Sequence, residues 1–290
     1  MLVTLNEIMK DAYAKKYAVG AFNTVNLASI RAVLDAAEKL DAPVILQHAQ
    51  IHERIAPLKV IGPVMLEMAK AAQVPVCVHL DHGEDIDYLL SAMEMGFTSV
   101  MFDGSALPYD ENVAGTRAVV QAAANYNVSV EAELGRVLRP EGGGETSGEE
   151  ADLTPEDCYT KPGEAQAFVE ATGIDALAIA FGTAHGVYEA EPKLDFSRIA
   201  EIRRAVNMPL VMHGGSGTPD EQVREAVRLG ICKLNVFSEI IDAYYREMKK
   251  QLNEMENMAI WPSTANLRPL NALKEAVSKK IMLLGSDNRS

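Results

Sequence analysis

Residues that could do metal chemistry stand at the ends of short apolar runs. His79 ends PVCVH and His82 follows it closely, His185 comes after ALAIAF, and His213 ends PLVMH. Neutral imidazole is a common zinc ligand, and three protein ligands with one open position are typical of a catalytic site. Such runs indicate buried parallel strands, whose carboxyl ends build the sites of α/β barrels. The pattern predicts one metal site assembled from several strand ends.

Carboxylates accompany these imidazoles. We expect the third run to end near His79, so that the following turn presents both Asp81 and His82 inward. A carboxylate in the position of Asp81 either ligates a cation or moves protons, and the sequence leaves both roles open. Asp103 and Glu133 face the same rim. Together with the neighbouring Glu131, these acids either hold a second cation, support the ligands or simply fix loops.

Two further strand ends suit a phosphate group. Gly214, Gly215 and Ser216 follow the seventh run directly and precede a helix start, while Asn235 and Ser238 follow the eighth. Glycines let the backbone approach an anion, and a helix N-terminus supplies N–H donors. The loops after strands seven and eight are the usual phosphate site of a (β/α)₈ barrel.

Eight strand-like runs alternate with amphipathic stretches, which indicates parallel pairing. The runs lie at residues 17–22, 43–47, 75–79, 98–102, 128–134, 176–181, 209–213 and 232–236. Eight such units favour an α/β fold of the (β/α)₈ TIM barrel type, as a single domain over residues 1–290. A doubly wound sheet is the alternative, although no G-x-G-x-x-G follows the first run. The stretch from about residue 239 predicts an added C-terminal helical segment, and residues 139–162 predict a mobile loop over the site.

Composition limits the classes of partner. The chain has 48% hydrophobic residues and a net charge of −14, which disfavours nucleic acid and anionic membranes. Three widely separated cysteines fit a reduced, cytoplasmic protein. The N-terminus lacks the apolar core of a signal peptide, and no run is long enough to span a membrane.

Several motifs together resemble one enzyme family. HLDHG, VMFDGSALPYDENV, VSVEAELG, DALAIAFGTAHGVYEAEPKLDF, PLVMHGGSG and GICKLNVFSE occur in the order found in the class II, zinc-dependent ketose-bisphosphate aldolases. The similarity runs from YAVGAFN to GSDN and so covers nearly the whole chain. It implies reversible cleavage of a ketose phosphate, such as fructose or tagatose 1,6-bisphosphate, into dihydroxyacetone phosphate and an aldehyde such as glyceraldehyde 3-phosphate.

The resemblance also implies roles for particular residues. Zinc would be bound by His82, His185 and His213, with Asp81 exchanging a proton with the substrate hydroxyl and His79 as a neighbour. Zinc would act as a Lewis acid on the ketone, so Lys233 is expected to form a structural ion pair rather than a Schiff base. A sodium or potassium ion near the phosphate, and a homodimer or homotetramer, are further family features. The implied substrate-binding residues are Gly186, Gly214, Gly215, Ser216, Asn235, Val236, Phe237 and Ser238.

Departures from the family pattern leave the substrate open. Residues after Gly135 form a longer, differently spaced loop, in which Glu141 or Glu145 would be the acid that deprotonates dihydroxyacetone phosphate. Glu189 replaces a frequent lysine. His48 and His52, interpreted as loop residues, replace a small Ser/Gly-rich turn. Another phosphorylated or deoxy sugar acid, a non-catalytic partner subunit and a zinc hydrolase are the alternatives.

Overall fold

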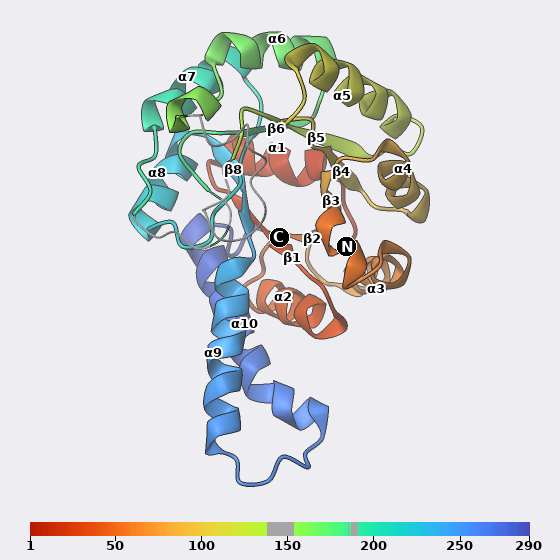
Figure 1. Cartoon of the computed structure of the whole chain (residues 1–290), viewed down its shortest axis with the longest axis vertical. Coiled ribbons are helices and arrows are strands. Elements are labelled where there is room, and N and C mark those ends of the chain that lie inside the picture. The colour runs from red at the N-terminus through yellow and green to blue at the C-terminus, as the bar shows by residue number, and fades with distance from the viewer. Residues whose placement is uncertain (138–153, 185, 187–190) are drawn as a thin grey trace.

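Eight parallel strands close into a barrel, as the sequence predicted (Figure 1). The computed structural model describes residues 1–137, 154–184, 186 and 191–290; His185, Glu189 and residues 139–153 of the predicted loop, with Glu141 and Glu145, lie outside this part. Every strand pairs with the next along the chain, and β8 returns to β1. The strands are β1 (Val19–Asn23), β2 (Val44–Ala49), β3 (Val76–Gly83), β4 (Ser99–Phe102), β5 (Ser129–Leu134), β6 (Ala176–Ile179), β7 (Leu210–Met212) and β8 (Ile231–Val236).

Helices surround the barrel and also close one end of it. The helices in the described part are α1 (Leu5–Lys15), α2 (Leu27–Lys39), α3 (Leu58–Ala71), α4 (Ile86–Met95), α5 (Tyr109–Ala123), α6 (Pro162–Thr172), α7 (Phe196–Val206), α8 (Asp220–Leu229), α9 (Ser238–Glu254) and α10 (Pro262–Leu284), with short 3-10 turns η1 (Gln50–Arg54) and η3 (Pro155–Cys158). Two assignments correct the sequence interpretation: α1 was not expected, and η3 occupies part of the predicted 139–162 loop.

The barrel interior is apolar at one end and polar toward the other. Leu5, Ile8 and Met9 of α1 pack with Ile45 and Val211 of the strands in one buried cluster, so α1 closes the N-terminal end. A second, larger cluster fills the layer between the strands and the surrounding helices. Burial of these apolar faces holds the carboxyl ends of the strands at the opposite, open end.

Strand β3 differs from its prediction in a way that shapes the site. The strand does not end near His79 but continues to Gly83, with a register shift against β4 between Leu80 and Gly83. His82 has a positive φ of 46°, which is uncommon for a residue with a side chain. An irregular strand therefore presents both Asp81 and His82 to one site, in place of the turn that we expected.

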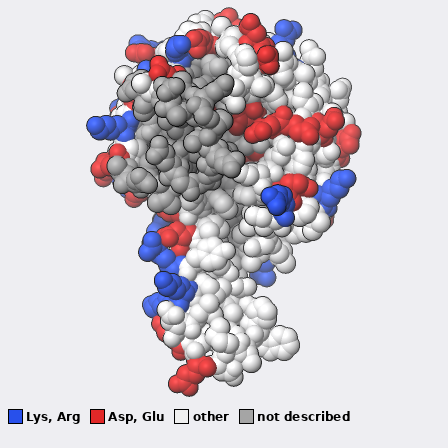
Figure 2. Space-filling view, in the orientation of Figure 1, with Lys and Arg blue, Asp and Glu red and all other residues white. Residues whose placement is uncertain are grey.

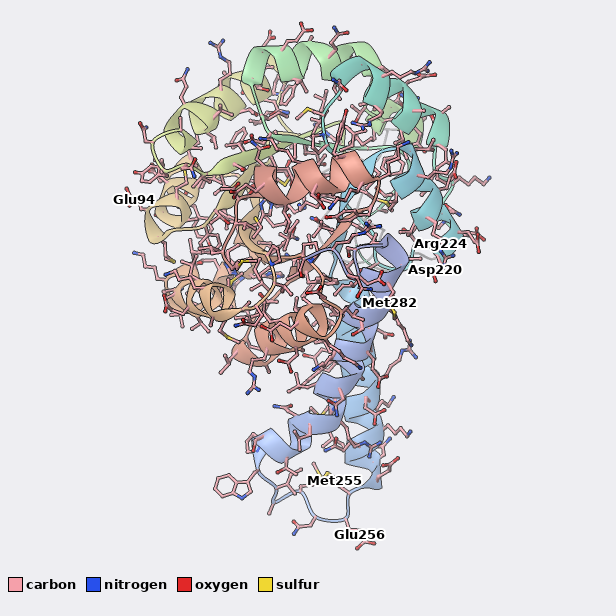
Figure 3. The ribbon with its side chains drawn as sticks, turned by 180° about the vertical axis from the view of Figure 1, so that it is seen from behind. Glu94, Asp220, Arg224, Met255, Glu256 and Met282 are labelled. Atoms are coloured by element: carbon pink, nitrogen blue, oxygen red, sulfur yellow. The ribbon has the colours of Figure 1, made fainter. Side chains whose placement is uncertain are left out.

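The C-terminal segment forms a helical hairpin that extends beyond the barrel (Figure 1). Helices α9 and α10 pack against each other, and Met255 and Glu256 mark the turn at its far end (Figure 3). One side of the projection carries few charged groups (Figure 2). Among the described residues, none of the helices is long and apolar enough to cross a membrane.

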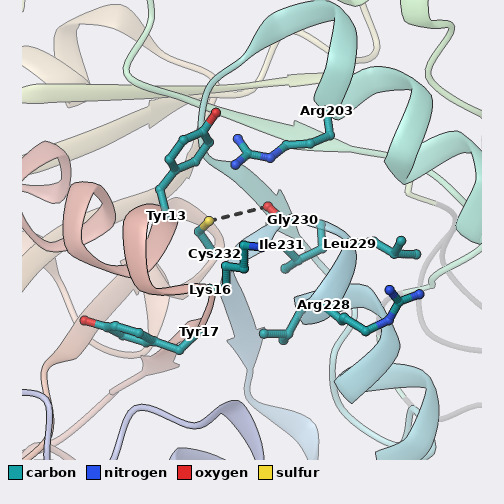
Figure 4. A pocket seen from close by; sticks show the side chains of 10 residues that line it. Tyr13, Lys16, Tyr17, Arg203, Arg228, Leu229, Gly230, Ile231 and Cys232 are labelled. Carbon is teal, nitrogen blue, oxygen red and sulfur yellow. Dashed lines mark hydrogen bonds between the residues drawn. The ribbon is translucent and has the colours of Figure 1, made fainter.

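A small cavity of about 210 Å³ lies at the N-terminal end of the barrel, beside α1 and the start of β8 (Figure 4). Its polar groups are used structurally: the Arg203 guanidinium lies 3.3 Å from the Tyr13 ring centroid and donates to the Met208 carbonyl. Burial raises the pKa of the Cys232 thiol to about 11. The described histidines and carboxylates expected to do chemistry lie at the other end of the barrel.

Candidate metal and phosphate site

Three side chains at the carboxyl end of the barrel could hold one metal ion. One potential ligand atom from each of Asp81, His82 and His213 lies within 4.8 Å of the others. Two of these residues come from β3 and the third follows β7, so barrel closure brings them together. Two nitrogens and a carboxylate oxygen suit a divalent transition metal such as zinc. The group fits a metal centre.

The imidazole of His82 is oriented by Asp103. His82 Nδ1 lies 2.7 Å from Asp103 Oδ2, and Asp103 Oδ1 accepts from the Ser105 hydroxyl at 2.7 Å. A carboxylate on one ring nitrogen directs the other toward a metal and makes it more basic. A second group that could hold a cation combines His82 with Asp103 and Glu133.

His213 lies in a buried network of charged side chains. Its Nε2 is 3.0 Å from Glu131 Oε1, and its Nδ1 is 3.2 Å from Glu133 Oε2. Lys233 forms the expected ion pair with Glu131, at 2.8 Å. His79 Nδ1 is hydrogen-bonded to the Ser99 hydroxyl at 2.8 Å, and His79 Nε2 lies 3.9 Å from Glu131 Oε2. The network fixes His213 and neutralises charge beneath the site.

The carboxylates and imidazoles shift one another's pKa values. Burial opposes ionisation of Asp81, but the positive charges of His82, Lys233 and His213 outweigh it and lower the Asp81 pKa. Burial likewise lowers the pKa of His213, yet its hydrogen bonds and charge interactions with Glu131 and Glu133 raise it to about 10. The site therefore concentrates negative charge where a cation would bind.

Two asparagines hold the carboxylate of Asp81. Asn23 Nδ2 donates to one oxygen at 3.1 Å, and Asn235 Nδ2 donates to the other at 3.0 Å. Gln47 Nε2 donates to Asn23 Oδ1 at 3.2 Å and so orients that side-chain amide. Strands β1, β2, β3 and β8 thus cooperate to place one carboxylate. Asn23 and Gln47 were not predicted as site residues, although Asn23 ends β1 and Gln47 ends the predicted run 43–47.

The two predicted phosphate loops lie against each other. The Gly215 N–H donates to the Asn235 carbonyl at 3.1 Å, and the Ser216 hydroxyl accepts from the backbone of Phe237 and Glu239 at 3.1 and 3.3 Å. Gly214 has a φ of 70°, and a Cβ there would lie 2.3 Å from the Ala184 oxygen. Only glycine suits that backbone, so Gly214 allows the turn after β7 to pack closely against the Ala184 backbone.

The remaining predicted substrate residues are placed differently from one another. Val236 is buried in the cluster between strands and helices, and Phe237 packs with a ring-centroid distance of 5.1 Å on His52. Ser238 begins α9. Gly186 has a φ of 98° and stands between residues outside the described part. The predicted ligand His185 is one of those residues.

His48 and His52 do not lie in an irregular loop, as the sequence interpretation expected, but in β2 and η1. His48 is a fully buried member of β2, with Nε2 3.1 Å from the Tyr88 hydroxyl, and His52 lies in η1. The Tyr88 hydroxyl donates to Glu53 at 2.6 Å. In the sequence, His48 directly follows the predicted run 43–47 and His52 stands four residues later. This spacing was the available signal that the two rings lie close together.

The arrangement combines a cation site, a buried ionised carboxylate and a glycine-rich turn. Such a set can polarise a carbonyl, exchange a proton and hold an anion within one barrel mouth.

Comparisons with known proteins agree with this geometry. Residues 3–289 match the family model described as Fructose-bisphosphate aldolase class-II. The chain is 39% identical over 296 residues to a sulfofructosephosphate aldolase from Alkalicoccus urumqiensis, covering 98% of this chain and 96% of the relative.

Solved structures extend the similarity to the whole fold. The YdjI aldolase from Escherichia coli K12 superposes with a TM-score of 0.86 at 34% identity, over 99% of this chain and 98% of that one. A putative fructose-1,6-biphosphate aldolase from Coccidioides immitis gives a TM-score of 0.86 at 28% identity, over 98% and 96% of the two chains.

Proposed function

Because the chain belongs to the class II fructose-bisphosphate aldolase family and is therefore an aldehyde-lyase, we propose that it reversibly cleaves a ketose phosphate into dihydroxyacetone phosphate and an aldehyde. The observation that carries this proposal is the meeting of Asp81, His82 and His213 at the barrel mouth. The glycine-rich turn directly follows His213, so the proposed metal site would lie beside the proposed anion site.

The proposed metal is zinc, held by His82 and His213 and by His185, as the family resemblance implies. When bound, zinc supplies a Lewis acid that polarises the ketone and stabilises negative charge as the carbon–carbon bond breaks. Asp103 keeps the His82 ring in its ligating orientation, and the Glu131–Lys233 pair keeps His213 in place. Glu133 and Asp103 are the candidates for a second cation.

Asp81 is the proposed proton carrier. Its lowered pKa keeps the carboxylate ionised, so it can accept the proton of the substrate hydroxyl next to the bond that breaks. The reverse reaction returns that proton to the new hydroxyl. The two asparagine donors hold the carboxylate in place throughout.

The phosphate of dihydroxyacetone phosphate is assigned to the turn of Gly214, Gly215 and Ser216, the loop from Asn235 to Ser238, and Gly186. A sodium or potassium ion is proposed beside this phosphate. Asn235 also holds Asp81, so the same loop would link phosphate binding with proton transfer.

The aldehyde half distinguishes the candidate substrates. Relatives are named for sulfofructose phosphate and for fructose 1,6-bisphosphate, which share the dihydroxyacetone phosphate half and differ in the other. Fructose or tagatose 1,6-bisphosphate, a sulfonated ketose phosphate and a phosphorylated or deoxy sugar acid are the candidates. The alternative that is not an enzyme is a non-catalytic partner subunit.

Solvent exchange of one C3 proton of dihydroxyacetone phosphate tests the proposal without knowledge of the aldehyde. We expect deuterium from water to enter the substrate in the presence of zinc and to be lost with chelator. A chain that binds zinc stoichiometrically but exchanges no proton would favour the partner-subunit alternative.

A further inference from the structure

His48 and His52 lie near the proposed proton carrier Asp81 but have no role in the proposed metal and phosphate sites. His52 packs against Phe237, which leads into α9, with ring centroids 5.1 Å apart. On the other side of η1, Gln50 Oε1 accepts from the backbone of Glu84 and Asp85 at 2.9 and 3.3 Å. The turn is thus fixed between the loops after β8 and β3.

Contacts with Tyr88 define which nitrogen of His48 carries the proton. The single hydroxyl proton of Tyr88 is donated to Glu53 at 2.6 Å, so the Tyr88 oxygen accepts from His48 Nε2 at 3.1 Å. Burial lowers the pKa of His48 to about 4, which keeps the ring neutral. A neutral ring protonated on Nε2 presents Nδ1 as an acceptor.

Both histidines have a buried nitrogen in need of a partner. Within the described residues, Nδ1 of His48 and Nδ1 of His52 are buried and make no hydrogen bond. The two rings are neighbours in an edge-on arrangement, with centroids 6.3 Å apart. Buried polar atoms usually have a protein, water or ligand partner. Ala49 of β2 pairs with Asp81 of β3, so His48 lies one residue before the strand position beside the proposed proton carrier, and His52 packs on Phe237 of the loop that follows β8.

The surroundings favour a hydroxyl group over an anion as that partner. Both pKa values are lowered by burial, so the rings are neutral at pH 7, and the carboxylates of Glu53 and Asp81 lie nearby. A hydroxyl can donate to a neutral ring nitrogen, whereas a phosphate or sulfonate would be repelled by these carboxylates and would gain no charge attraction from the neutral rings.

Resting on the proposed aldolase function, we propose that His48 and His52 bind a hydroxyl group of the aldehyde half of the substrate and so select hydroxylated aldehydes. The Gly214 to Ser216 turn is assigned to the other half. Glu53 and Tyr88 are positioning residues, because they act through the His48 ring.

The test compares condensation of dihydroxyacetone phosphate with glyceraldehyde and with propanal, which lacks both hydroxyls. For the zinc-loaded wild type we expect kcat/KM to be at least about tenfold higher with glyceraldehyde. In His48→Leu and His52→Leu this ratio should fall to within about threefold, chiefly through the loss with glyceraldehyde. His48→Asn, which keeps a polar atom near the Nδ1 position, should restore part of the ratio. Ile51→Ala, an exposed neighbour in η1, is the control and should keep the wild-type ratio.

Failure of this inference is distinct from failure of the proposed function. Wild-type condensation with both aldehydes at equal kcat/KM would overturn the inference alone, as would equal losses with both aldehydes in the two Leu variants. No condensation with either aldehyde would contradict the aldolase assignment itself. If a variant does not fold, the wild-type ratio and the His48→Asn variant still decide.

Discussion

At the scale of residues, the partners of each imidazole decide what it can bind. His82 has one nitrogen against Asp103, whereas His213 has carboxylates at both of its nitrogens. The first arrangement orients a ligand, and the second attracts a proton when no metal is bound. Removing a partner should therefore affect metal affinity before it affects the fold.

The Asp103→Asn variant tests the orienting role. We expect zinc affinity to fall by about 10- to 100-fold, because the amide no longer favours the His82 tautomer with Nε2 toward the metal. Competition with a chromophoric chelator measures this change. Asp110→Asn, in the exposed first turn of α5, is the control. Equal affinities in both variants would contradict the role given to Asp103.

Metal binding should depend on pH through His213. Its pKa of about 10 means that the metal-free ring is protonated below that pH, and a metal must displace the proton. Affinity should therefore rise toward pH 10, by about tenfold per pH unit for each proton displaced. Calorimetry in buffers of different ionisation enthalpy should find about one or more protons released per zinc at pH 7.5. A pH-independent affinity would contradict the network.

Residue types at strand ends allowed much of this group to be predicted from the sequence. Asp81, His82, His213, Asp103 and Glu133 were expected at one rim and meet there. The pairing of His48 with Tyr88 was not predictable, because it joins β2 to α4 and depends on how the helix packs.

At the scale of elements, an ion pair between a buried lysine and a partly exposed glutamate connects the C-terminal helix to the proposed phosphate loops. Lys280 of α10 lies 2.9 Å from Glu239 Oε2, and the same carboxylate oxygen accepts from the Gly217 N–H at 3.3 Å. Ser216 accepts from the Glu239 backbone. Helix α10 thereby supports the turn after β7 and the start of α9 together.

The Lys280→Met variant tests this support. We expect KM for the phosphorylated substrate to rise by about five- to tenfold with a smaller change in kcat, because only binding geometry is disturbed. Lys279→Met is the control, since Lys279 is the exposed neighbour. Steady-state kinetics and a thermal unfolding midpoint should be measured together. Equal KM values in the two variants would mean that α10 does not position the loops.

Strand order was predictable, whereas local irregularity was not. Apolar runs such as PVCVH mark strands by residue type, but the register shift in β3 depends on pairing with β4. The sequence gives no clear signal for the left-handed backbone at His82, because that conformation is usually marked by glycine or asparagine. Helix α1 was predictable, because its buried residues Leu5, Ile8, Met9 and Ala12 have helical spacing and Thr4 with Glu7 forms a capping box.

At the scale of the whole molecule, the projecting hairpin exposes several large apolar side chains. Tyr245, Met258, Trp261 and Leu267 on α9, α10 and their connection are all more than half exposed, and Trp261 is 79% exposed. Clustered apolar exposure of this kind is typical of an interface. We propose that this hairpin is the interface of a homodimer or homotetramer.

The Trp261→Asp variant tests that proposal. We expect sedimentation to show an oligomer for the wild type and a shift toward the monomer for the variant, because a charge at an apolar contact is unfavourable. Tyr126→Asp, 41% exposed on the barrel, is the control and should remain oligomeric. A wild-type monomer at micromolar concentration would contradict the assignment of the hairpin as an interface.

Zinc-dependent release of dihydroxyacetone phosphate from ketose phosphates tests the central claim most directly. Fructose 1,6-bisphosphate, tagatose 1,6-bisphosphate and a sulfonated fructose 1-phosphate should be compared, with zinc, with chelator, and in His213→Ala. We predict release from at least one of them, lost with chelator and reduced at least about a thousandfold in the variant. Undiminished release by His213→Ala, or by the chelated wild type, would contradict a metal-dependent aldolase.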